Sequence, residues 1–332
     1  MDRSILTYVL INPASRSGLG LKLWETQLAA VFEEGGFVCR LLLSKEKHGL
    51  TALARDLTSA HRLEKINLIV LGGDGTLGEV LEGIEDFSRV CLGYIPIGSS
   101  NDFARAIGQT DPVETARAIV RGRGLHACDL GELTWLDEAD GKEKKRYFLV
   151  SAGFGFDAAA CEAADHSRMK KLLNRVHMGK LIYIFSAFRL ILTSRLTPVE
   201  VCVRQDLPMG GTTPAEETLS FRRTLFAVCM NHRYEGGGFM FCPQADGTDG
   251  KLDLCVAADI TRLKFFFLFP TAYDGRHTRL KGITIRQGTS MLFRSEVPLF
   301  FHTDGEVTGK TTRMEARVRR GVLRFWNEFS EL

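Results

Sequence analysis

One short stretch of the chain combines the residue types that hold a phosphate group. The sequence Leu-Gly-Gly-Asp-Gly-Thr at positions 71–76 directly follows an apolar run and precedes a helical pattern. Glycines at 72, 73 and 75 allow a tight turn that presents backbone N–H groups to an anion. The start of the following helix adds its positive end, and Thr76 can cap that helix or donate to a phosphate. The stretch predicts a phosphate loop; the alternative is a tight strand-to-helix turn without a ligand.

Asp74 is unexpected inside a phosphate loop. A carboxylate repels phosphate unless a metal ion or a transferable proton is involved. Nothing in the local sequence pattern requires an aspartate at this position for structural reasons. The sequence therefore predicts that Asp74 takes part in the chemistry.

Two further loops, residues 12–20 and 96–105, also follow apolar runs and precede helical patterns. The first is rich in small hydrogen-bond donors, as phosphate loops are, although an Asn-Pro turn needs no ligand. The second opens a helix at Asn101 or Asp102, which an ordinary N-cap would also explain. The candidate contacts in these loops are Asn12, Pro13, Ser15, Arg16, Ser99, Asn101 and Asp102.

Composition excludes several classes of protein. A net charge of +3 is too small for a dedicated nucleic-acid binder. The sequence has no Walker motif and no dinucleotide-binding glycine motif. Eight cysteines without a Cys-x-x-Cys pair indicate reduced thiols in a cytoplasmic protein. No apolar run reaches membrane-spanning length, and the first one is too short for a signal peptide.

The elements that position these loops alternate regularly over residues 1–124, with short connections between them. Such alternation predicts a doubly wound parallel α/β domain, in which ligands lie beyond the carboxyl ends of the strands. All three loops follow strands and therefore lie at that edge. The predicted strands are 4–11, 37–43, 66–71 and 90–97. The predicted helices are 19–34, 50–61, a short helix that follows the loop at 71–76 and runs through residue 83, and 113–120.

Strands dominate residues 125–332, which predicts an antiparallel β-sandwich domain, with the active site in the cleft between the two domains. A helical insertion interrupts it near 157–194, and the Phe-rich run 265–269 is interpreted as core. From Arg168 to Arg195 the chain carries seven Lys or Arg residues and no acid. A basic amphipathic helix of this kind suits an anionic membrane surface, or it packs on the sandwich with a solvated basic face.

The three loops, in this order and spacing, resemble the diacylglycerol kinase catalytic-domain family, which includes bacterial lipid kinases, sphingosine kinases and, more distantly, NAD kinases. The resemblance continues through most of the chain. The matching blocks are Asp129–Gly131, Ser151–Asp157, Asn231 with Tyr234–Gly238 and Pro243, Asp249–Asp253, and Asp304–Glu306.

The resemblance implies that the loop Gly72–Thr76 binds the phosphates of ATP, helped by residues 12–16. Ser44 and Ser99 stand where the family has threonine, so each keeps a hydroxyl; Gly78 stands where the family has a side-chain donor. The family's proton acceptor for the lipid hydroxyl falls on Asp304, although Asp-Gly is also a common hairpin turn. The implied nucleotide contacts include Gly72, Gly73, Asp74, Gly75, Thr76 and Glu79, and the implied catalytic residues are Asp304, Asp74 and Glu306. The resemblance also implies a structural Mg²⁺ at Asp246, Asp249 and Lys251, with Asp246 and Lys251 binding through their backbone carbonyls.

The expected function is thus an ATP- and Mg²⁺-dependent kinase that phosphorylates a lipid alcohol, with diacylglycerol giving phosphatidic acid as the first choice. An NAD kinase, a sphingoid-base kinase and a non-catalytic nucleotide- or lipid-binding module are the alternatives. The expected location is the cytoplasm, with peripheral contact at the inner membrane face through residues 168–195. No nucleic-acid partner is expected, and the sequence leaves a homodimer open.

Overall fold

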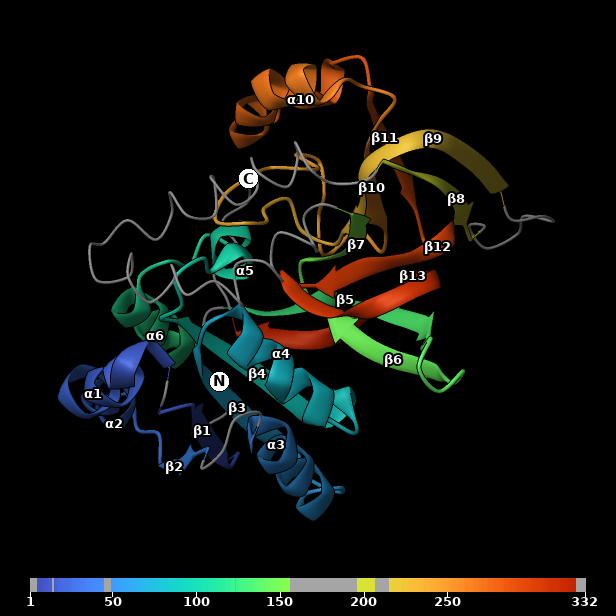
Figure 1. Ribbon diagram of the computed structural model, residues 1–332. Helices are drawn as coiled ribbons and strands as arrows, with labels where there is room; N and C mark the ends of the chain where they lie inside the picture. Colours follow the sequence, from blue (N-terminus) through green and yellow to red (C-terminus); the bar gives the residue numbers. More distant parts are fainter. Residues whose placement is uncertain are drawn as a thin grey trace. The chain divides into compact units, whose positions relative to one another are not determined.

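The computed structural model describes residues 5–13, 15–44, 49–122, 124–155, 196–206 and 215–326 (Figure 1). The predicted helical insertion at 157–194 lies outside the described residues. The chain divides into two compact units. The first contains residues 1–130, 236–238 and 319–332, and the second contains 131–235 and 239–318. The sequence argument placed 319–332 in the second domain, but Phe325 pairs with Leu92 of the first unit.

The first unit is built on a parallel sheet, as predicted. Its strands are ordered β2 (Cys39–Leu43), β1 (Thr7–Ile11), β3 (Ile66–Gly72) and β4 (Val90–Pro96). All residues of β1, β3 and β4 are buried, which explains their continuous apolar runs. Ile11, Leu71 and Ile95 are paired in register, so the loops after these strands leave the sheet at one level.

Helices connect the parallel strands. The pattern predicted over 19–34 forms α1 (Leu19–Leu23), a π-helical turn at Trp24–Leu28 and α2 (Ala29–Glu34). Its apolar residues Trp24, Leu28 and Phe32 recur at helical spacing and are buried in the core. The remaining helices are α3 (Gly49–Ala60), α4 (Asp74–Gly83), α5 (Asp102–Ala106) and α6 (Pro112–Arg121).

The second unit is antiparallel, as predicted. Two long strands organise it, because β9 and β12 each pair with β8 along one part and with β7 along another. A register shift between Arg294 and Leu299 interrupts the ladder that β12 forms with β13. Its strands are β5 (Leu125–Leu136), β6 (Glu143–Phe148), β7 (Ser151–Gly155), β8 (Thr197–Gln205), β9 (Ala215–Met230), β10 (Leu252–Ala258), β11 (Ile283–Gly288), β12 (Ser290–Thr303) and β13 (Glu306–Trp326). Residues 125–130 of β5 and 319–326 of β13 belong to the first unit.

Helix α10 (Arg262–Leu268) differs from the prediction that the Phe-rich run 265–269 belongs to the core. Residues 265–269 were interpreted as core, but only two of these five side chains are buried. Phe265 and Leu268 are buried, whereas Phe266 and Phe267 are exposed. The physical reason is that a helix packed on one side buries only residues three or four positions apart, such as these two, and turns the residues between them outward.

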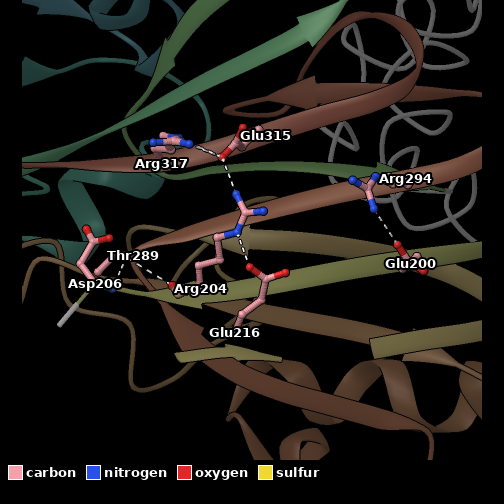
Figure 2. A network of polar contacts seen from close by, with 8 residues as sticks. All are labelled: Glu200, Arg204, Asp206, Glu216, Thr289, Arg294, Glu315 and Arg317. Carbon is pink, nitrogen blue, oxygen red and sulfur yellow. Dashed lines mark hydrogen bonds and ion pairs between the residues drawn. The ribbon is translucent and has the colours of Figure 1, made fainter. Parts of the chain in front are cut away.

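Exposed ion pairs cross the strands of the second unit. Figure 2 shows Arg204 of β8 between Glu216 of β9 and Glu315 of β13, at N–O distances of 2.9 and 3.7 Å. Arg294 and Glu200 form a separate pair at 3.0 Å. The Arg204–Glu216 and Arg294–Glu200 pairs are solvated, so each contributes about 1 kcal/mol or less to stability.

Two further sequence predictions concern the described residues. Their seven cysteines form no disulfide, and six of them are buried. None of the described helices is long and apolar enough to cross a bilayer.

Candidate functional site

The three predicted loops lie together in the first unit. The Ile97 N–H donates to the Gly72 carbonyl at 2.8 Å, and the guanidinium of Arg16 donates to the Ile97 carbonyl at 3.1 Å. The backbones of Gly73 and Gly98 approach so closely that a Cβ on Gly98 would lie 2.7 Å from the Gly73 Cα. Glycine is required at this contact because any side chain would push the two loops apart.

Helix α4 begins at Asp74, and its N-cap residue Gly73 makes no side-chain cap. The N–H groups of a helix's first turn have no partner within the helix, so this end suits an anion. Thr76 and Ser44 are buried, Arg16 and Ser99 are exposed, and Asn12, Pro13 and Glu79 are half-buried. The side chain of Ser15 is not among those described.

Asp74 has a structural role that the sequence argument denied. Its Oδ1 accepts a hydrogen bond from the Tyr94 hydroxyl at 3.2 Å, and its Oδ2 accepts one from the Asp102 backbone N–H at 2.8 Å. Asp74 therefore caps α5 from a neighbouring loop, while Asn101, at the N-cap with φ of 50°, makes no cap of its own. Burial, followed by the charge of Asp74, raises the pKa of Tyr94 well above its ordinary value, so the hydroxyl remains a donor.

Asp102 faces the glycine-rich segment 236–238. Its carboxylate accepts the Gly237 N–H at 3.0 Å. Burial raises the pKa of Asp102, and hydrogen bonds from the glycine backbone and the charge of Arg105 oppose that shift. Gly236, Gly237 and Gly238 all have positive φ, a conformation that favours glycine. Asp102 thus positions this segment against α5.

Asp304 belongs to the second unit, where it forms a hairpin turn with Gly305 between β12 and β13. Both residues have positive φ, as the Asp-Gly pattern predicts. The carboxylate does more than form a turn: it accepts backbone N–H groups from Leu149 at 2.9 Å, Val150 at 2.7 Å and Ser151 at 3.0 Å. Burial raises the pKa of Asp304, and these three hydrogen bonds oppose the shift.

Arg146 is a residue near Asp304 that the sequence argument missed. It donates to Glu306 at 2.8 Å, and its charge lowers the pKa of Asp304 slightly. A guanidinium is also suited to bind a phosphoryl group. No motif includes Arg146, because it lies on β6 and reaches Glu306 only through the pairing of distant strands.

The predicted metal residues lie in the loop before β10. The Asp249 carboxylate accepts the Lys251 N–H at 2.9 Å and the Gln287 amide at 3.1 Å, and Lys251 Nζ donates to the same Gln287 at 3.0 Å. Burial, followed by the charges of Asp249 and Asp246, raises the pKa of nearby Asp253 to about 6. The described side chains contain no group of three or more His, Cys, Asp or Glu residues arranged for a metal. One carboxylate with two backbone carbonyls, the predicted donor set, is all oxygen and suits Mg²⁺ in type.

The structure thus brings together the three predicted loops of the first unit. In the second unit, Asp304 contacts the backbone of residues 149–151, whereas Asp249 and Lys251 contact Gln287. The predicted cleft between the units stays a prediction.

Comparison with known proteins covers most of the chain. Residues 7–133 match the model of the diacylglycerol kinase catalytic domain, and residues 150–326 match the YegS C-terminal NAD kinase beta sandwich-like domain. The chain is 27% identical to the Bacillus subtilis protein YtlR over 308 residues, which is 92% of this chain and 94% of that protein. It is 29% identical to the diacylglycerol kinase of Mycobacterium tuberculosis H37Rv over 279 residues, or 83% and 80% of the two chains.

A solved structure shows the same fold. A crystal structure from Bacillus anthracis str. Sterne superposes with a TM-score of 0.70 at 21% identity and covers 99% of both chains. The match to the second family model alone spans more than half of the residues. Taken with the loops described above, these matches show that the chain belongs to the family that joins a diacylglycerol kinase catalytic domain to a YegS C-terminal NAD kinase beta sandwich-like domain.

Proposed function

We propose that this protein is a lipid kinase that transfers the γ-phosphoryl group of ATP to the hydroxyl of a lipid alcohol, diacylglycerol being the first choice. The observation that carries the proposal is the glycine-lined meeting of the loops after β1, β3 and β4, in a chain of this family. Phosphoryl transfer needs a positioned donor and neutralised phosphate charge. In this proposal the N–H groups at the start of α4 position the phosphates, and the Arg16 guanidinium neutralises their charge, at one edge of the sheet.

In this proposal Asp304 accepts the proton of the attacking hydroxyl. Its Oδ1 receives two backbone N–H groups and its Oδ2 receives one. A carboxylate offers about four lone-pair positions, so Oδ2 can accept one more hydrogen bond. The raised pKa brings the carboxylate closer to the working pH of a general base. Asp74 and Asp102 position the nucleotide loops rather than react.

The deciding experiment incubates the full chain with γ-labelled ATP and, separately, dispersed diacylglycerol, a sphingoid base and NAD. Label on diacylglycerol supports the proposal, and label on the sphingoid base alone would change the acceptor. Label on NAD alone would reject the lipid kinase in favour of the NAD kinase. Nucleotide binding without any labelled product would indicate a non-catalytic module.

Gly78 offers a test of nucleotide affinity. It lies on α4, and a Cβ there would meet nothing within 4 Å, so a side chain can be added. We expect Gly78→Asn to lower the KM for ATP with kcat little changed, because it restores a donor. Gly78→Ala is the matched control, since it also adds a Cβ and favours the helix over glycine but adds no donor. Identical KM values for the two variants would show that no donor is missing.

Mg²⁺ would be held by the Asp249 carboxylate with the backbone carbonyls of Asp246 and Lys251, where it would supply positive charge to an acidic loop. At about 100 times its Kd, a bound ion raises stability by about 3 kcal/mol. We expect Mg²⁺ to raise the Tm of the wild type and of Asp246→Asn, whose carbonyl is retained. We expect no shift for Asp249→Ala. Equal shifts in all three proteins, measured calorimetrically, would place the ion elsewhere.

A further inference from the structure

Helix α10 has two apolar faces, one buried and one largely exposed. Phe265 and Leu268 are buried, and the Phe265 ring lies 6.0 Å from the ring of Phe226. On the outer face, Leu263, Phe266 and Phe267 are 66%, 38% and 70% exposed. Their spacing of three and four residues places them side by side on one face of the helix. In Figure 1, α10 (orange) lies between β10 and β11 along the chain.

Exposed aromatic side chains are concentrated here. In the part of the chain that the structure describes, the exposed aromatic residues are Phe266, Phe267 and Tyr273. All three lie on α10 or on the 3₁₀ turn that continues it, Phe269–Tyr273. Single exposed apolar residues are ordinary, but a group of bulky ones marks a surface that another apolar phase covers.

The segment that contains this apolar face carries a net positive charge. Residues 261–281 contain five Lys or Arg residues and one acid, Asp274, which pairs with Arg276 at 2.6 Å. Lys264, Arg279 and Lys281 are exposed. An apolar face bordered by cations complements an anionic bilayer, where rings enter the headgroup boundary and cations meet lipid phosphates.

We propose that the exposed face of α10, formed by Leu263, Phe266 and Phe267, docks on an anionic membrane together with the exposed cations of the same segment, Lys264 on the helix and Arg279 and Lys281 after it. This surface differs from residues 168–195, for which the sequence predicts the membrane contact and which lie outside the described residues. The purpose of docking rests on the proposed lipid acceptor. Docking itself does not, and it can be measured without catalysis.

The first test is co-sedimentation of the full chain with phosphatidylcholine vesicles, with and without phosphatidylglycerol. We expect Leu263→Ser/Phe267→Ser to weaken binding to phosphatidylglycerol vesicles by about tenfold or more, because two bulky side chains no longer enter the bilayer. Val38→Ser/Leu63→Ser is the matched control: both residues are more than 80% exposed and belong to the first unit. Its binding should equal that of the wild type.

The second test concerns charge. We expect Lys264→Glu/Arg279→Glu to weaken binding to phosphatidylglycerol vesicles, and added salt to weaken wild-type binding, because exposed charges are screened. Lys22→Glu/Lys142→Glu makes the same change of net charge at exposed sites elsewhere and should bind like the wild type. If both double variants lost vesicle binding equally, net charge alone would be responsible, and this result would overturn the assignment to α10.

Two other results would also overturn it. One is unchanged vesicle binding by Leu263→Ser/Phe267→Ser while substitution of Lys170, Lys171, Arg175 and Lys180 by Glu abolishes binding. The other is light scattering that shows a dimer converted to a monomer by Leu263→Ser/Phe267→Ser, since a second copy would then cover the face. Phosphorylation of a dispersed short-chain acceptor is measured in parallel. If it is absent in the wild type, the proposed function fails whatever the vesicles show.

Discussion

Asp304→Asn is expected to lower kcat by about 10²–10⁴-fold, because removing a general base has an effect of this size. Asn-Gly forms the same hairpin turn as Asp-Gly, so the turn between β12 and β13 is retained. One carboxylate oxygen becomes an NH₂ group that faces backbone donors, which lowers stability by about 1–3 kcal/mol. The rate is therefore measured well below the Tm of the variant, with nucleotide binding recorded on the same sample.

The chain provides a matched control for Asp304. Asp140-Gly141 is a second Asp-Gly turn, between β5 and β6, and Asp140 accepts the Lys142 N–H at 3.0 Å. Asp140→Asn should leave kcat unchanged. In the wild type, burial raises the pKa of Asp304, so kcat/KM should fall on the acid side at a pH above the ordinary range of a carboxylate. Equal kcat values for wild type and Asp304→Asn would reject the role of Asp304 as base.

Asp74→Ala is expected to lower the free energy of unfolding by about 2–6 kcal/mol. The Tyr94 hydroxyl and the Asp102 N–H would each lose an acceptor in a partly buried setting, at about 1–3 kcal/mol apiece. Tyr94→Phe removes one partner and should cost about 1 kcal/mol. The double variant should be more stable than the sum of the two losses predicts, because it leaves one unpaired donor instead of two.

Denaturant unfolding of the four proteins measures this coupling, and Asp56→Ala, an exposed residue on α3, serves as the control. If Asp74 only faced phosphate, its removal would relieve repulsion and leave stability unchanged or higher. A stable Asp74→Ala protein would therefore restore the purely chemical role that the sequence suggested.

The sequence predicted the local parts of the fold well, because they depend on short-range pattern. The buried strands at 66–71 and 90–97, the helix over 19–34 with its glycine stop, and the antiparallel second unit are all present. It missed β13, a 21-residue strand rich in charged residues. Such a strand shows no clear apolar alternation, since it forms a strand through its pairing with β12 and β5.

By itself the sequence determined which residue types are present and in what order, and therefore the family, the phosphate-loop candidates and the Asp-Gly turn at Asp304. Only the tertiary structure decided what the polar side chains contact. Asp74 meets Tyr94, and Asp304 meets the amides of 149–151, across long separations in the chain. The exposure of Phe267 was also a tertiary outcome. Hydrogen bonds and burial depend on which strands become neighbours, and that is set by the packing of the whole unit rather than by any local pattern.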